Sequence, residues 1–143
     1  MTGKHLAQLR DVEPLLRRPL TVAVLGAHDD AARPAHYVPA WLAAHGHRIL
    51  PVNPRLVGRH VLGAPVRGTL AELDEPVDVV DVFRRREDVP AHVGDILAMR
   101  HRPGVVWLQS GIDHPEACAT LRAAGIDTVA DRCMLADGRA LGL

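Results

Sequence analysis

The sequence predicts a doubly wound α/β domain, with five strands in a mainly parallel sheet, helices on both faces and an N-terminal helix. Two observations predict this fold class. From residue 20 onward, short apolar segments alternate with segments of helical periodicity. The apolar segments lack the polar alternation of half-exposed strands, as strands do when helices cover both faces of a sheet. A Rossmann-like sheet built from right-handed crossovers fits this pattern.

Five apolar segments are the expected strands, and residues that end strands follow most of them. Gly26 closes the first segment, and Asn53-Pro54 stops the second. The expected strands cover residues 20–25, 47–52, 77–83, 105–108 and 127–130.

Four segments carry apolar residues at the three- or four-residue spacing of amphipathic helices. They cover residues 4–18, 36–45, 87–100 and 114–124. Pro19 should end the first helix, and Asp113 should cap the start of the last. Residues 55–76 and 134–143 are expected to be mostly irregular. We expect one domain over 1–143, with an N-terminal helical extension over 1–19 and a core over 20–134.

Composition and charge argue against several classes of protein. The 17 basic and 17 acidic residues cancel, whereas nucleic-acid binders usually carry a basic excess. No apolar run approaches the roughly 20 residues that a membrane span needs. Residues 1–9 lack the apolar centre of a signal peptide, and two cysteines are too few for a disulfide scaffold. We therefore expect a cytoplasmic protein without a nucleic-acid or membrane partner.

The expected strands lead into a set of polar and small residues. In doubly wound sheets, ligands bind beyond the carboxyl ends of the strands, so these residues should lie together. They offer many donors for phosphate or amide groups. The predicted binding residues are Gly26, Ala27, His28, Arg33, Pro34, Asn53, Pro54, Arg55, Phe83, Arg84, Gln109, Gly111 and Cys133.

The first two strand ends bear on the kind of nucleotide. The dinucleotide pattern G-x-G-x-x-G is absent, because His28 and Ala31 stand where the second and third glycines belong. Asn53 replaces the acidic residue that holds the ribose hydroxyls of NAD, and Arg55 adds a cation. This pattern suits a phosphorylated ribose, as in NADP or the 3′-phospho-ADP part of coenzyme A. Alternatively, Asn53 belongs to a simple turn and Arg55 is solvated.

The first loop also carries two acidic residues. Asp29 and Asp30 would repel a phosphate unless they point away from it, and Arg33 at the far end of the loop could compensate.

Four segments resemble motifs of the CoA-binding domain family, small proteins similar to the CoA-binding domain of the succinyl-CoA synthetase alpha subunit. The segments are Pro51–Pro54, Val77–Arg84, Val106–Gln109 with Gly111-Ile112, and Asp131–Cys133. The resemblance runs from about residue 20 to 134 and implies a Rossmann-like fold that binds CoA or a CoA thioester. It implies no particular reaction. Two departures are His28, where the family usually has a small hydroxyl residue, and a tail without the usual basic or His-containing stretch.

No catalytic or metal-binding set of residues stands out in the sequence. Asp78 and Asp81 are expected on opposite faces of one strand, so they cannot act as a pair. The histidines His36, His45, His47 and His101 lie on helix faces or at element ends, where solvated side chains are usual. Cys133 is the best candidate nucleophile, because the preceding Arg132 favours a thiolate. Alternatively, Cys133 is a buried and inert cysteine.

The leading hypothesis is a module that binds coenzyme A or an acyl-CoA, as a regulator or carrier without catalysis of its own. An alternative is an NADP-dependent oxidoreductase domain, which has the same fold and would likewise use Arg55 to bind a ribose phosphate. A second alternative is a structural or interaction subunit that binds no ligand. The neutral charge balance and the acidic loop at Asp29-Asp30 keep this last alternative open.

Overall fold

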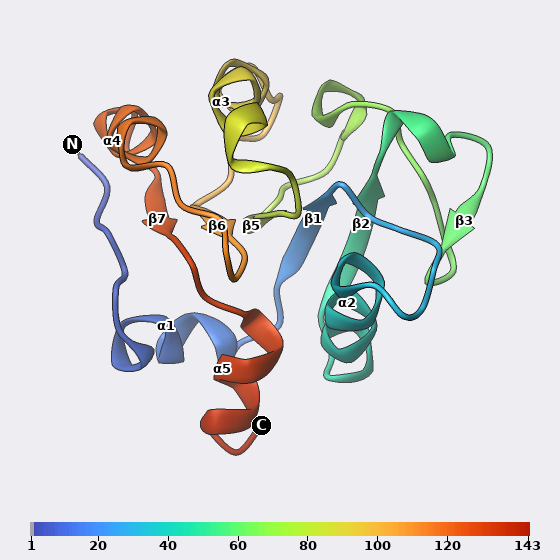
Figure 1. Ribbon diagram of the computed structural model, residues 1–143, viewed down its shortest axis with the longest axis horizontal. Coiled ribbons are helices and arrows are strands. Elements are labelled where there is room, and N and C mark those ends of the chain that lie inside the picture. Colours follow the sequence, from blue (N-terminus) through green and yellow to red (C-terminus); the bar gives the residue numbers. More distant parts are fainter. Residues whose placement is uncertain (1) are drawn as a thin grey trace.

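The computed structural model describes residues 2–143 and confirms the parallel five-stranded sheet (Figure 1). Its strands are β1 (Thr21–Leu25), β2 (Arg48–Val52), β5 (Val79–Val82), β6 (Val105–Leu108) and β7 (Asp127–Val129). Their order is β2-β1-β5-β6-β7, and every neighbouring pair is parallel. The chain proceeds from β1 to one side and later returns to the other, so the topological switch point lies between β1 and β5.

Helices cover both faces of the sheet, as the sequence predicts. They are α1 (Leu9–Leu16), α2 (Pro34–Ala44), α3 (Val89–Leu97), α4 (Pro115–Ala123) and α5 (Met134–Ala140). Helices α3 and α4 lie on one face, and α1, α2 and α5 lie on the other (Figure 1). None of the helices within residues 2–143 has the length and apolar character needed to cross a membrane.

Short elements fill the segment between β2 and β5. A small antiparallel hairpin is formed by β3 (His60–Val61) and β4 (Ala64–Pro65). Single turns of 3-10 helix occur at η1 (Pro54–Leu56), η2 (Leu70–Glu72) and, after β5, η3 (Arg86–Asp88).

The strand side chains form a hydrophobic core on each face. Val80 and Val82 of β5 pack toward α3 and α4, whereas Val79 packs toward α1, α2 and α5. Trp107 of β6 is fully buried, and its indole Nε1 donates to the Arg132 carbonyl oxygen at 2.7 Å. Apart from Asp81 of β5, the buried side chains on both faces of the central strands are apolar, which explains the hydrophobic segments in the sequence.

The first helix begins later than predicted. Residues 4–6 run along the edge of β7, where Leu6 N donates to the Thr128 carbonyl and Thr128 N donates to the Lys4 carbonyl. This pairing satisfies backbone groups that an edge strand otherwise leaves free. Helix α1 then starts after Gln8, its N-cap, and continues through Pro14.

The prediction of an irregular tail is wrong, because residues 134–140 form α5. Met134 is fully buried and anchors the first turn in the core. Gly138, a poor helix former, lies against the Trp41 ring on α2, where no space remains for a side chain. Tertiary packing therefore outweighs the weak helical propensity of this segment.

Three smaller predictions are also wrong. His114 caps α4 in place of Asp113, since its Nδ1 accepts from Ala117 N at 3.1 Å. His47 is buried, and its Nδ1 accepts from Leu20 N at 3.1 Å. Asp78 precedes β5, and its Oδ2 accepts from Thr21 N at 2.8 Å.

Candidate functional site

A cleft of about 1160 Å³ opens at the carboxyl ends of the strands. The residues after β1, β2, β5 and β6 line it, together with the starts of α2 and α3 and with Cys133. It spans the switch point between β1 and β5, which is where doubly wound sheets bind ligands. Its volume suits an extended ligand, because pockets for drug-sized molecules reach only about 1,000 Å³.

The cleft brings together most of the predicted binding residues. Those that line it are Gly26, His28, Arg33, Pro34, Asn53, Arg55, Phe83, Arg84, Gln109 and Cys133. Three others do not line it. Ala27 is buried below, Pro54 starts η1, and Gly111 turns away so that its N–H donates to Asp131 Oδ1 at 2.7 Å.

Further lining residues were missed by the sequence reasoning. They are Ala35, Tyr37, Val38, Leu56, Arg85, Asp88, Ala91, His92, Ser110 and Ile112. Ser110 and Arg85 adjoin predicted residues, so a wider window at each strand end would have included them. Ala91 and His92 lie on α3, and no local pattern marks that helix as a wall of the cleft.

Gly26 shapes the floor of the cleft. Its φ of 90° lies in the left-handed region that favours glycine. A Cβ at this position would collide with the Phe83 carbonyl oxygen, and would also press on the Arg84 side chain. Glycine therefore lets the ends of β1 and β5 approach each other at the switch point.

Asn53 ties two loops of the site together. Its Nδ2 donates to the Ala27 carbonyl oxygen at 2.8 Å, and its Oδ1 accepts from Arg55 N at 2.9 Å. A carboxylate could not donate to Ala27, so the amide is needed for the structure itself. The same contact with Arg55 N fixes the turn from which the Arg55 side chain reaches the cleft.

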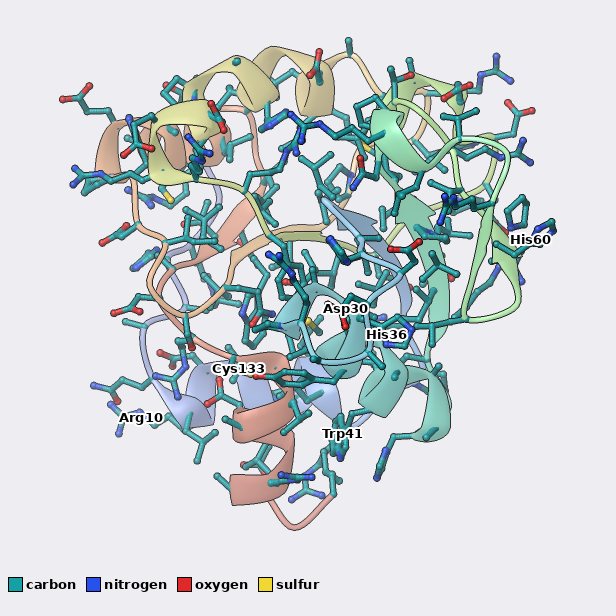
Figure 2. All side chains as sticks on the ribbon, turned by 45° about the vertical axis from the view of Figure 1, so that its right-hand side comes forward. Arg10, Asp30, His36, Trp41, His60 and Cys133 are labelled. Carbon is teal, nitrogen blue, oxygen red and sulfur yellow. The ribbon has the colours of Figure 1, made fainter. Side chains whose placement is uncertain are left out.

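The acidic residues of the first loop are engaged by arginines. Asp29 Oδ2 accepts from Arg59 Nη1 at 2.7 Å, and Asp30 Oδ2 lies 3.9 Å from Arg33 Nε. Figure 2 shows Asp30 on this loop and His36 on the first turn of α2. These contacts reduce the repulsion that the sequence predicts between the loop and an anion.

His28 is oriented by the same loop. Its Nδ1 accepts from Asp30 N at 2.9 Å. In the neutral ring the proton is therefore assigned to Nε2, which is available as a hydrogen-bond donor.

The cleft is cationic along one part and uncharged along the other. Arg33, Arg55, Arg84 and Arg85 line the part over β2, β1 and β5, and the one lining carboxylate among residues 2–143 is Asp88. The lining over β6 and at the start of α5 carries no charged side chain within the described residues. It consists of Gln109, Ser110, Ile112 and Cys133.

A buried carboxyl group lies beneath the uncharged part. Asp81 of β5 is fully buried, and its Oδ1 accepts from Gln109 Nε2 at 2.7 Å. Burial raises the pKa of Asp81 to about 8, although the hydrogen bond from Gln109 opposes the shift. The group is thus largely a neutral acid at pH 7.

Cys133 lies beside the first turn of α5, at the uncharged part of the cleft (Figure 2). The prediction that Arg132 activates this thiol is not supported by the geometry. The Arg132 guanidinium donates to both carboxylate oxygens of Asp137, at 2.8 and 2.9 Å. Cys118 is buried in the core, and burial is the main cause of its raised pKa. Within residues 2–143, no cluster of three or more His, Cys, Asp or Glu side chains could hold a metal ion.

Comparison with known proteins identifies relatives along nearly the whole chain. Residues 20–139 match the family described as CoA binding domain. The YneT protein of Bacillus subtilis (strain 168) is 32% identical over 124 residues, which are 87% of this chain and 89% of YneT.

Two solved structures have the same fold. Cell-free ID.343 from Thermus thermophilus has a TM-score of 0.88 and 47% identity, covering 94% of this chain and 98% of that chain. A hypothetical protein from Pyrococcus horikoshii OT3 has a TM-score of 0.85 and 28% identity, covering 95% and 93% of the two chains. With its strand-end motifs and the family match over residues 20–139, the chain belongs to the CoA binding domain family.

Proposed function

We propose that this protein binds coenzyme A or an acyl-CoA in the cleft, as a carrier or regulatory module. The observation that carries the proposal is the division of the cleft into a cationic and an uncharged part. Coenzyme A has the same division, because a 3′-phosphate and a pyrophosphate stand at one end and a neutral pantetheine chain forms the other. The phosphates then lie over β2, β1 and β5, and the pantetheine chain extends over β6 toward Cys133.

Arg55 is the residue that we assign to the ribose 3′-phosphate. It follows β2, where the ribose-binding residue of a doubly wound nucleotide site stands. The guanidinium lines the cleft and forms no ion pair with any residue of 2–143. A planar guanidinium binds phosphate through two parallel hydrogen bonds, which makes Arg55 suited to this role.

The pyrophosphate has a second set of donors at the start of α2. Pro34 occupies the first turn of this 11-residue helix and lines the cleft together with Arg33. Pro34 has no N–H, and the N–H groups of His36 and Tyr37 donate to the Arg33 carbonyl oxygen, so Ala35 N–H and the helix dipole are what this terminus offers an anion. The Nε2 donor of His28 adds to this set.

NADP is the second candidate ligand, because Arg55 would serve its ribose phosphate equally well. Titration calorimetry with CoA, dephospho-CoA, NADP and NAD distinguishes the candidates. We expect CoA to bind more tightly than NADP, and NAD not to bind. NAD binding more tightly than CoA would contradict the proposal.

The variant Arg55→Ala tests the assignment of the 3′-phosphate. It should make the binding free energy of CoA less favourable by about 1.5–3 kcal/mol, the contribution of a hydrogen bond to a charged group. Dephospho-CoA, which lacks the 3′-phosphate, should bind the variant and the wild type equally. Arg100→Ala is the matched control, because Arg100 is an exposed cation outside the cleft that pairs with Asp74. Equal losses for CoA and dephospho-CoA would place Arg55 elsewhere in the site.

A further inference from the structure

Asp81 is a polar residue in the middle of an apolar sheet. In register it lies between Val24 of β1 and Trp107 of β6, and its side chain is fully buried. Oδ1 accepts from Gln109, whereas Oδ2 is buried without a hydrogen-bond partner among residues 2–143. Burying a carboxyl group whose Oδ2 has no hydrogen-bond partner is unfavourable, and an apolar side chain would stabilise the core more.

Gln109 connects this buried carboxyl group to the cleft. The residue is only 4% exposed, yet it lines the cleft. Its Nε2 donates to Asp81 beneath the cleft, so the other polar atom of the amide, Oε1, points the opposite way. Oε1 accepts no hydrogen bond from residues 2–143. It is not fully buried either, so it is open to the cleft that Gln109 lines.

The contact between the two side chains determines what Gln109 presents to a ligand. While Nε2 donates to Asp81, the amide cannot turn over, and the cleft meets an acceptor. Without Asp81, the amide is free to flip and to present its NH₂ group, which is a donor. The lining nearby is uncharged and includes Ser110, Ile112 and Cys133. A ligand segment that fits here is neutral and carries an N–H group.

We propose that Asp81 is a positioning residue that holds the Gln109 amide so that Oε1 accepts a hydrogen bond from a secondary amide N–H of the pantetheine chain. This inference rests on the proposed binding of CoA and specifies how the uncharged part of the cleft recognises its ligand. The neutral state that burial gives the Asp81 carboxyl at pH 7 adds no charge beneath the ligand. With the carboxyl proton on Oδ2, Oδ1 is the carbonyl acceptor that meets the NH₂ group of Gln109 and not Oε1.

Calorimetry with CoA and with 3′-phospho-ADP, which lacks the pantetheine chain, tests the inference. Asp81→Leu should raise the Kd for CoA about tenfold, as expected for the loss of one hydrogen bond. The Kd for 3′-phospho-ADP should change less than about twofold, a difference that a general structural defect would not produce. Asp81→Asn keeps a carbonyl oxygen at the position of Oδ1 and should bind CoA as the wild type does.

Gln109→Leu provides a second route if Asp81→Leu does not fold. It should weaken CoA as much as Asp81→Leu does, and the double variant should be no weaker than either single variant. Equal losses for both ligands, no loss for CoA, or failure of Asp81→Asn to restore binding would overturn the inference while leaving the proposed function intact. If the wild type binds no CoA, the proposed function and this inference both fall.

Discussion

Asp81→Asn should stabilise the protein progressively as the pH rises. The carboxyl has a pKa of about 8 in the fold, raised by burial from 3.8 in the unfolded chain. Between these values the folded state keeps a proton that the unfolded state releases. The wild type therefore holds this part of its stability fully below pH 3.8 and loses it as the pH rises through about 8.

Because the folded state binds one more proton than the unfolded state, the unfolding free energy falls by about 1.4 kcal/mol per pH unit. From pH 5 to pH 7.5 the titration of Asp81 alone should lower the unfolding free energy of the wild type by about 3 kcal/mol. Asparagine does not titrate and makes no such change. The extra N–H groups of asparagine cost about 1–3 kcal/mol, but equally at every pH. The other titrating groups contribute equally to the unfolding free energy of both proteins, so their contributions cancel in the difference.

Urea denaturation of both proteins in the same buffers measures the difference in unfolding free energy. We expect that difference to move by about 3 kcal/mol in favour of Asp81→Asn between pH 5 and pH 7.5. A difference that stays constant over this range would show that Asp81 is not a buried neutral acid, and would refute the reasoning.

Two further predictions concern His47 and Cys133. Burial, with a smaller effect of His45, lowers the pKa of His47 below 6.5, so the protein should lose stability as the pH falls from 6.5 through that lower value. His47→Gln should flatten this loss in urea titrations at pH 5 and 7. With CoA disulfide, the Cys133 thiolate should form a mixed disulfide and release one CoA thiolate, which intact-mass analysis and peptide mapping detect. An adduct found only on the buried Cys118, or none at all, would contradict the position of Cys133 beside the ligand.

The sequence predicts best those parts of the structure that depend on local patterns. Except for Asp81, the buried side chains of the central strands are apolar on both faces, so the positions of these strands follow from composition and from the residues that end them. Helix α5 could not be predicted in this way, because Gly138 fits there only through its contact with Trp41, far away in the chain. The pairing of residues 4–6 with β7 is similarly non-local, and the apolar spacing that starts at Leu6 resembles that of a helix.

The candidate site shows the same limit. Strand-end positions such as Arg55 and Gln109 were identified because parallel strands bring their carboxyl ends to one edge. His92 was missed, since it reaches the cleft from α3, where Arg84 Nε lies 3.4 Å from its Nε2. The sequence also suggested a ligand-binding reason for Asn53, and the structure adds a reason that no local pattern reveals, because its amide joins two loops.

The strand order gives the cleft a direction that the order along the chain does not reveal. In space, β1 lies between β2 and β5, so Arg55 and Arg84 flank Gly26 although they are far apart in the sequence. Gln109 follows on β6, beyond both cations. A ligand with one anionic end and one neutral end can therefore satisfy the cleft in only one direction. Reversing it would place the phosphates over the lining of Gln109, Ser110 and Cys133, which offers no cation, and leave the arginines without an anion.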